Sequence, residues 1–368
     1  NEITEIAKEE NVPPVVLKDA IDLAINRGIL LAPESLIRRN VKTLAINTEI
    51  PDSYLRASVF TLQWHVTQAC DLQCRHCYDR SNRASLTLAD GLKVLSNLDK
   101  FCKKRHVRGH VSFTGGNPLL YPDLNNLYRA ASHRGFSISI LGNPTDQRRI
   151  EDLIAIQMPV FFQVSLEGLP EHNDTIRGNG HFDRTIQFLK ILNELEVSSK
   201  VMLTLTKDNF NQVLPLSDML EGITTDFTFN RLSRIGSGAG LALPSPDEFA
   251  AFLKEYITAA TNKPMLRLKD NLLNILLYNS GGPLFGGCTG YGCGAAFCFL
   301  TILSDGEVHA CRKFPSPIGN LLDQTLDDIY DSDIAERYRN GARECRECCI
   351  RPVCGGCMAT TYSCGLDP

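Results

Sequence analysis

Three cysteines lie close together in the first third of the chain, at Cys70, Cys74 and Cys77. Their spacing, Cys-x3-Cys-x2-Cys, directly follows an alternating stretch that ends near Val66. Cysteine thiolates are the usual ligands of iron–sulfur clusters, so three of them can bind three irons of a four-iron cubane. The fourth iron then stays open to a small molecule. The spacing therefore predicts a [4Fe–4S] cluster with one open iron.

A zinc loop and purely structural cysteines are the alternatives. Structural zinc sites use four ligands, commonly arranged as separated pairs. Disulfide pairing would leave one thiol of the three without a partner. We therefore favour the iron–sulfur interpretation.

The three-cysteine motif, with Tyr78 directly after it, resembles that of the radical S-adenosylmethionine (SAM) enzymes. In that family the open iron binds the amino and carboxylate groups of SAM, and one electron from the cluster cleaves SAM to a 5′-deoxyadenosyl radical. The resemblance implies that Cys70, Cys74 and Cys77 are the catalytic cluster ligands and that Tyr78 helps to bind the cofactor. The difficult chemistry then belongs to the cofactor, which the protein binds and orients.

A second motif, Gly115-Gly116-Asn117-Pro118, carries the same resemblance. It corresponds to the family's Gly-Gly-Glu-Pro loop, which holds the methionine amine of SAM. Glycines let a backbone approach a ligand closely. The Asn117 amide oxygen can accept a hydrogen bond from an ammonium, although without the charge that glutamate brings. A simple turn is the alternative.

The stretch from Val164 to Gly178 resembles one that is common in peptide-modifying members of the family. By that resemblance Ser165 and Arg177 lie near the SAM carboxylate. A guanidinium suits this role because its planar fork matches a carboxylate. A surface ion pair is the alternative for Arg177.

Strands and helices alternate around these motifs. Apolar and alternating runs predict strands at 59–66, 110–113, 137–141, 160–168, 200–206 and 226–229. Strands separated by helices form parallel sheets with right-handed crossovers. About six such units are fewer than the eight of a complete TIM barrel. We therefore predict an α/β fold, an open partial (β/α)6 TIM-like barrel, which the resemblance also implies.

The two ends of the chain depart from this alternation. Residues 1–50 form an N-terminal helical segment, which we interpret as a helical cap rather than a winged-helix reader of leader peptides. By the same resemblance, we expect residues 51–280 to form the radical SAM partial barrel and residues 281–368 to form a small Cys-rich iron–sulfur domain. Since the first residue is Asn rather than Met, the natural start can lie upstream.

Ten of the 14 cysteines crowd the C-terminal domain. Their order resembles that of the SPASM domain, which carries two auxiliary [4Fe–4S] clusters. The resemblance selects one set for the cluster nearer the barrel and another for the farther cluster: Cys288, Cys293, Cys311 and Cys357, then Cys345, Cys348, Cys354 and Cys364. A zinc-ribbon-like double site is the alternative, because the Cys-x2-Cys pairs would also suit zinc.

Two cysteines remain outside these sets. Cys349 directly follows a proposed ligand, and adjacent side chains rarely point the same way. Cys298 lies in an apolar run from Ala295 to Leu303, where free cysteine packs as a small hydrophobe. One departure from the SPASM pattern is the spacing of Cys354 and Cys357, which are separated by two residues instead of the usual three.

The composition of the chain limits its expected binding partners and its expected cellular compartment. The formal net charge is −4 and no Lys/Arg run forms a phosphate or membrane patch, so we expect neither nucleic acid nor a membrane as a partner. No apolar run approaches ~20 residues. Crowded cysteines with His and Gly among them indicate metal ligation in a reducing compartment. We therefore expect a cytoplasmic protein.

Family members that combine these two domains mostly modify peptides or proteins. The resemblance implies a radical SAM oxidoreductase that abstracts hydrogen from a ribosomally made precursor peptide and installs a crosslink or another modification. Its cofactors would be SAM and three [4Fe–4S] clusters, and its electron donor would be flavodoxin- or ferredoxin-like. The Gly-Gly-Asn-Pro loop and the N-terminal helices resemble those of selenobiotic-type peptide maturases.

Two alternative functions remain open. Anaerobic sulfatase-maturating (formylglycine-forming) enzymes carry an aspartate, as their proposed base, directly after the cysteine that corresponds to Cys311. Here that residue is Arg312, which makes this function less favoured. A non-catalytic iron–sulfur or zinc scaffold protein is the other alternative.

Overall fold

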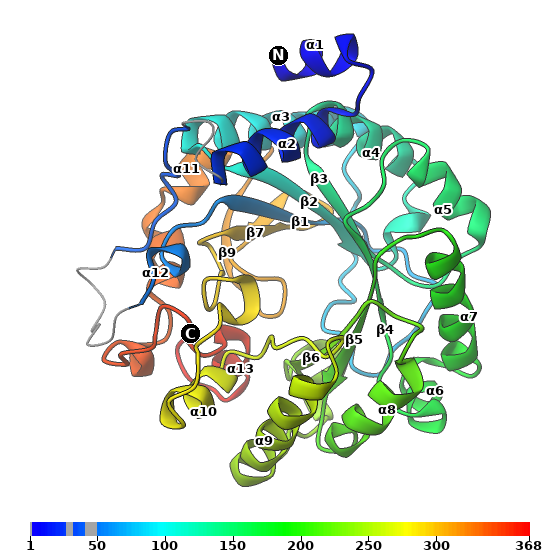
Figure 1. The fold of residues 1–368 in the computed structure, drawn as a ribbon, viewed down its shortest axis with the longest axis vertical. Coiled ribbons are helices and arrows are strands. Elements are labelled where there is room, and N and C mark those ends of the chain that lie inside the picture. The colour runs from blue at the N-terminus through cyan, green and yellow to red at the C-terminus, as the bar shows by residue number, and fades with distance from the viewer. Residues whose placement is uncertain (1, 27–31, 41–49) are drawn as a thin grey trace.

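The computed structural model describes residues 2–26, 32–40 and 50–368. Its centre is one curved sheet of nine strands in the order β6-β5-β4-β3-β2-β1-β7-β8-β9, with helices on its outer side (Figure 1). The strands are β1 (Val59–Thr67), β2 (Arg108–Gly115), β3 (Ser137–Leu141), β4 (Phe161–Ser165), β5 (Ser199–Leu205), β6 (Asp226–Arg231), β7 (Phe299–Ile302), β8 (Glu307–His309) and β9 (Pro317–Asn320).

The strands β1 to β6 pair in parallel, and each is followed by at least one helix. Helix α3 begins after Thr87, whose side chain accepts a hydrogen bond from the Asp90 N–H as an N-cap. The six strand–helix units confirm the predicted partial barrel. The helices that cover it are α3 (Leu88–Arg105), α4 (Leu124–His133), α5 (Gln147–Ile154), α6 (Pro170–Arg177), α7 (His181–Glu194), α8 (Val213–Leu220) and α9 (Pro246–Asn262).

Alternation along each parallel strand separates the core from the barrel interior. In β1, Phe60, Leu62 and Trp64 point to the helices and are almost fully buried. Aromatic rings continue this layer from strand to helix, since Trp64 stacks on Phe113 of β2 and Phe113 on Tyr128 of α4. The intervening positions, which are largely polar, face the inside of the barrel.

The C-terminal region extends the same sheet rather than forming a separate one. Strand β7 pairs in parallel with β1, from Thr61 opposite Phe299 to Trp64 opposite Ile302, and β8 and β9 follow as an antiparallel hairpin. Such short strands leave no periodic signal that the sequence could show. The remaining helices are α10 (Leu273–Asn279), α11 (Leu326–Tyr330), α12 (Asp333–Asn340) and α13 (Met358–Ser363).

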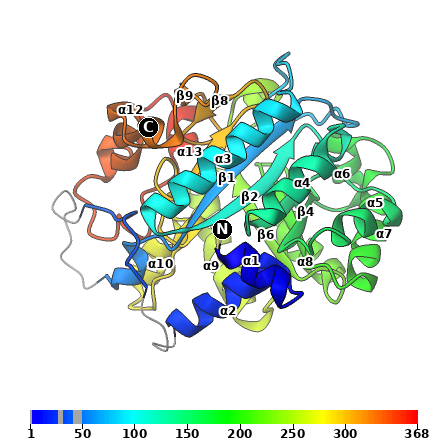
Figure 2. The same cartoon turned by 90° about the horizontal axis from the view of Figure 1, so that it is seen from above.

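The N-terminal helices lie on the outside of the barrel, beside α3 and α4 (Figures 1 and 2). They are α1 (Glu2–Glu9) and α2 (Pro14–Asn26), and α2 begins with a proline, which suits the first position of a helix. Residues 27–31 and 41–49 of the expected N-terminal segment lie outside the described residues. Two ion pairs tie α2 to the first residue of β2, from Arg108 to Asp19 and Asp22, both at 3.0 Å.

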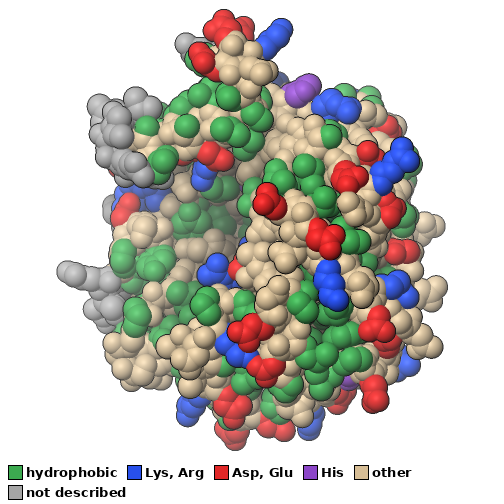
Figure 3. Space-filling model, turned by 45° about the vertical axis from the view of Figure 1, so that its right-hand side comes forward, with side chains coloured by type: hydrophobic (Ala, Val, Ile, Leu, Met, Phe, Trp, Pro, Cys, Tyr) green, Lys and Arg blue, Asp and Glu red, His purple; other side chains and the backbone are tan. Residues whose placement is uncertain are grey.

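The surface shows no concentration of charge on the face drawn in Figure 3, where acidic and basic side chains are interspersed. Within the described ranges, no helix is both long and apolar enough to cross a membrane.

The start of β2 offers a test of the packing. A Cβ added at Gly109 would lie 2.5 Å from the ring of Phe136, which is buried, and 3.2 Å from the Cys102 Sγ. We expect Gly109→Ala to lower the free energy of unfolding in urea by about 1–3 kcal/mol, because the ring must shift in a packed core. In Phe136→Leu the same change should be less destabilising. A Gly109→Ala variant as stable as the wild type would contradict this contact.

Candidate active site

A cavity of about 390 Å³ lies at the carboxyl ends of the parallel strands. The interior positions of the barrel strands supply part of its wall, including Gln163 and Ser165 of β4 and Met202 and Thr204 of β5. Eight of the nine residues predicted for SAM and its cluster line this one cavity: Cys70, Cys74, Cys77, Tyr78, Gly115, Gly116, Ser165 and Arg177. Asn117 is not among the lining residues.

The two glycines at the end of β2 allow two backbone segments to approach each other. A Cβ at Gly115 would lie 2.2 Å from the Thr67 carbonyl oxygen, and one at Gly116 would lie 2.3 Å from that of Ala69. The Gly116 N–H donates to the Thr67 oxygen at 2.9 Å. We expected these glycines to make room for a ligand. Both glycines line the cavity and lie close to the start of the cysteine loop, and their approach to a ligand stays a prediction.

The Asn117 side chain contacts the same cysteine loop. Its side chain is 3% exposed. Its Nδ2 donates to the Asp71 Oδ1 at 3.0 Å, and its Oδ1 accepts from the Leu119 N–H at 3.2 Å. Asn143, two residues after β3, donates to the same Asp71 oxygen at 2.6 Å. The Nδ2 and the Oδ1 of Asn117 thus each have a partner within the protein. The proposed contact of Asn117 with the SAM amine stays a prediction.

Glu167 is a buried carboxylate that joins the barrel to the cysteine loop. Its Oε1 accepts from Arg177 Nε at 2.8 Å and lies 3.3 Å from His76 Nε2, while Oε2 accepts from the Thr204 N–H at 2.7 Å. Burial alone would raise the pKa of Glu167, but His76, Arg177 and the Thr204 N–H hold the pKa far below its ordinary value. Glu167 is therefore a fixed anion that orients Arg177 and His76, which lies within the cysteine motif.

The surroundings of the cysteines suit iron-bound thiolates. Arg177 Nη1 lies 3.7 Å from the Cys74 Sγ, and Asn143 Nδ2 lies 3.6 Å from the Cys70 Sγ. Burial raises the pKa of Cys74, and the positive charge of Arg177 opposes this rise. Hydrogen bonds to sulfur are one of the means by which proteins tune iron–sulfur clusters. The donor set therefore fits a [4Fe–4S] cluster on Cys70, Cys74 and Cys77.

A second, smaller cavity of about 60 Å³ lies between the barrel and the C-terminal region, and all four cysteines predicted for the nearer cluster line it: Cys288, Cys293, Cys311 and Cys357. Asn271 braces two of their loops, because it accepts from the Cys288 N–H at 2.6 Å and donates to the Gly356 carbonyl. Burial would raise the pKa of Cys357, but Arg231 and Lys313 lower it. These cations suit a site that must hold several thiolates.

Three of the four cysteines predicted for the farther cluster lie near one another. Cys345, Cys348 and Cys354 lie close enough for their charges to interact, and burial raises the pKa of Cys354 to about 11. Cys364 is exposed after α13, and its place in this set stays a prediction. Cys298 is 5% exposed and packs in the core.

Two sequence families match the two parts of the chain. Residues 64–220 match the model of the radical SAM superfamily, and residues 293–349 match SPASM, an iron–sulfur cluster-binding domain. The chain thus combines a radical SAM domain with a SPASM domain. Across the residues that the structure describes, no three His, Cys, Asp or Glu side chains are close enough to hold a single metal ion. A cubane, by contrast, distributes its cysteine ligands over different irons.

Several known proteins are similar to most of this chain. It is 23% identical to the subtilosin biosynthesis protein AlbA of Bacillus subtilis, over 80% of this chain and 66% of AlbA, so it spans about two thirds of that relative. It is 26% identical to the mycofactocin maturase MftC of Mycolicibacterium smegmatis, over 83% of this chain and 79% of MftC. The crystal structure of Streptococcus suis SuiB has the same fold, with a TM-score of 0.66 at 21% identity, over 94% of this chain and 84% of SuiB.

Arg312 and Lys313 lie between the larger cavity, which the Cys70, Cys74 and Cys77 side chains line, and the smaller cavity of the C-terminal cysteines. Arg312 Nη1 donates to Thr114 Oγ1 at 3.2 Å, and its guanidinium lies 5.8 Å from the centre of the Tyr78 ring. Lys313 lines both cavities. Burial raises the pKa of Tyr78 to about 12, so its hydroxyl, 3.3 Å from His65 Nε2, stays protonated at neutral pH. The wall between the two cavities is therefore cationic.

The sequence analysis assigned no role in the site to Asn143, Glu167 or Lys313, and it named Arg312 only as a difference from the sulfatase-maturating enzymes. Asn143 and Glu167 could have been considered as site residues, because each lies two residues beyond a parallel strand. Active groups of such barrels lie at this end of the strands. For Arg312 and Lys313 the signal was their position directly after Cys311.

The buried pair of Glu167 and Arg177 gives a stability prediction. We expect Glu167→Gln to lower the free energy of unfolding of the metal-free protein by about 3–5 kcal/mol, since it leaves a buried guanidinium without its counter-charge. Urea denaturation measures the change. Glu171→Gln, an exposed change in the first turn of α6, is the control and should be close to neutral. Equal stability of the two variants would contradict the role given to Glu167.

The cysteine assignment gives a prediction for iron content. Three cubanes need about twelve irons per chain, and Cys311→Ala should lose about four of them. Cys298→Ser and Cys349→Ser should keep the full amount, because neither thiol is assigned to a cluster. Iron and sulfide analysis of anaerobically reconstituted protein measures this. A loss of about four irons in either serine variant would show that the ligand sets are wrong.

Proposed function

We propose that this chain is a radical SAM peptide maturase. It cleaves SAM to a 5′-deoxyadenosyl radical and abstracts hydrogen from a ribosomally made precursor peptide, which then acquires a crosslink or another modification. The observation that carries the proposal is the single cavity in which three cysteines meet Ser165 and Arg177, separated from a second group of cysteines only by a wall that contains Lys313.

In this proposal the residues that line the cavity have different roles. A [4Fe–4S] cluster on Cys70, Cys74 and Cys77 supplies the electron for SAM cleavage. Glu167 occupies Nε and Nη2 of Arg177. Nη1 lies 3.7 Å from the Cys74 Sγ, and its second N–H can donate to a SAM carboxylate. Ser165 offers a hydroxyl from the neighbouring strand end. The cysteines of the SPASM domain hold two auxiliary [4Fe–4S] clusters.

Several observations support a peptide as substrate. The relatives include AlbA, MftC and the sporulation killing factor maturation protein SkfB of Bacillus subtilis, which is 25% identical over 82% of this chain. SuiB has also been solved with its precursor peptide SuiA. The barrel stops at six units, and an open barrel can admit a substrate larger than a closed one can. The cationic side chain of Arg312 in the cavity argues against the sulfatase-maturating alternative, which uses an aspartate there.

The environment and the partners follow from the same chemistry. None of the fourteen cysteines forms a disulfide, which suits a reducing, cytoplasmic compartment. A one-electron donor of the flavodoxin or ferredoxin type would reduce the cluster. We assign residues 1–50, 51–280 and 281–368 to the N-terminal segment, the barrel and the SPASM domain, respectively.

The decisive experiment is SAM cleavage by anaerobically reconstituted protein with dithionite. We expect the wild type to be brown and to release 5′-deoxyadenosine, and Cys70→Ala, Cys74→Ala and Cys77→Ala to release none, because each removes a ligand of the cluster that binds SAM. Cys102→Ala is the matched control, since Cys102 is buried on α3 in the core and should be dispensable.

Two outcomes would overturn the proposal. Substantial release of 5′-deoxyadenosine by any of the three cluster variants would contradict the site. A colourless, zinc-loaded wild type that releases no nucleoside would favour the scaffold alternative. Mass spectrometry of a co-incubated precursor peptide then tests the substrate class, because a maturase changes the mass of the peptide and a SAM-cleaving protein of another class does not.

A further inference from the structure

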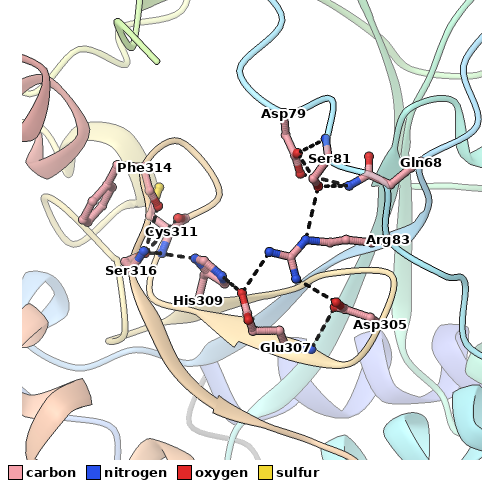
Figure 4. A network of polar contacts seen from close by, with 10 residues as sticks. All are labelled: Gln68, Asp79, Ser81, Arg83, Asp305, Glu307, His309, Cys311, Phe314 and Ser316. Atoms are coloured by element: carbon pink, nitrogen blue, oxygen red, sulfur yellow. Dashed lines mark hydrogen bonds and ion pairs between the residues drawn. The ribbon is translucent and has the colours of Figure 1, made fainter. Parts of the chain in front are cut away.

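A continuous series of polar contacts joins the cysteine loop of the barrel to Cys311 of the SPASM domain (Figure 4). It begins beside Cys77, whose Sγ lies 3.1 Å from the Asp79 carbonyl oxygen. The Asp79 carboxylate accepts from the Ser81 N–H at 2.8 Å and from Gln68 Nε2 at 2.9 Å. These contacts fix the chain that leaves the cysteine motif.

Arg83 carries the series across the domain boundary. Its Nε donates to Ser81 Oγ at 3.2 Å. On the other side its Nη1 donates to Asp305 Oδ2 at 2.7 Å, and its Nη2 to Glu307 Oε1 at 3.2 Å. A guanidinium can hold three partners in one plane in this way, whereas an ammonium cannot.

Within the SPASM domain the series ends on the backbone of Cys311. Glu307 Oε1 lies 2.5 Å from His309 Nε2, and His309 Nδ1 accepts from the Ser316 N–H at 3.0 Å. The His309 proton therefore lies on Nε2 and points to Glu307. The Ser316 hydroxyl accepts from the Cys311 N–H at 3.2 Å and lies 3.0 Å from the Cys311 carbonyl oxygen. Ser316 is fully buried.

We propose that Arg83, Glu307, His309 and Ser316 are positioning residues that fix Cys311 relative to the Cys77 loop. This rests on the proposed function, in which both cysteines are cluster ligands. Partners that orient metal ligands from outside the coordination sphere govern how firmly the metal is held. Here one set of partners would orient a SPASM ligand and also fix its place relative to the site of SAM cleavage.

Arg105 provides a matched control for Arg83. It also joins the two domains, from α3 to α11, where it pairs with Asp327 at 3.1 Å and Asp331 at 2.5 Å. Its side chain is 15% exposed and that of Arg83 is 25% exposed. Both arginines thus bind two carboxylates across the same boundary, but the contacts of Arg105 end in α11.

The experiment compares reconstituted wild type, Arg83→Met, Arg83→Lys, Ser316→Ala and Arg105→Met without any peptide. We expect Arg83→Met and Ser316→Ala to lose about four irons to a chelator on the order of 10-fold faster than the wild type. Their reduced auxiliary cluster should also give a broadened electron paramagnetic resonance signal. Arg83→Lys should release iron more slowly than Arg83→Met and faster than the wild type. Arg105→Met should lower the thermal unfolding midpoint and leave the iron release and the signal unchanged.

The outcomes separate this proposal from the proposed function. If Arg83→Met matches Arg105→Met in iron release and in spectrum, Arg83 is only an interdomain tie and the proposal is overturned, while the assignment of the cysteines stands. If Arg83→Met does not fold, Ser316→Ala decides alone. A wild type that binds only about four irons overturns the auxiliary ligand assignment and this proposal together.

Discussion

The arrangement of the active site depends on one buried carboxylate. Glu167 receives donors from three directions: Arg177 at the end of α6, His76 within the cysteine motif, and the backbone at the end of β5. A buried ion loses its hydration, so it is tolerated only when its lone pairs are satisfied. The contacts that satisfy Glu167 also set the orientation of Arg177 and the attachment of the loop, and neither could change without leaving a charge unpaired in the interior.

The strands support this arrangement because their apolar side chains point to the helices and their polar side chains point to the cavity. Positions such as Phe162 and Val164 of β4 pack against helices, and the neighbouring Gln163 and Ser165 face the cavity. The apolar positions stabilise the barrel whatever occupies the interior. The interior can therefore carry polar groups that would weaken a packed core.

Much of the fold could be predicted because it is periodic. The strand at 137–141, for example, was predicted with its observed bounds. The motif cysteines identified the cavity because their spacing is local. Glu167 could not be recognised in the same way, since its contacts with His76 and Thr204 join positions far apart in the sequence. For Asn117 the motif suggested a ligand, which stays a prediction, and gave no sign of its contacts with Asp71 and the backbone of Leu119.

The pairing of β7 with β1 makes the order of synthesis important for this protein. Gln63 and Thr301, which face each other across these strands, are 238 residues apart in the chain. At 5–20 residues per second, the ribosome needs about 10–50 s to make the intervening residues. During that time the first barrel strand has an unpaired edge, which is a surface prone to association with other strands. This edge of β1 is covered only after β7 has been made, so a strand from the C-terminal region protects the first strand of the barrel.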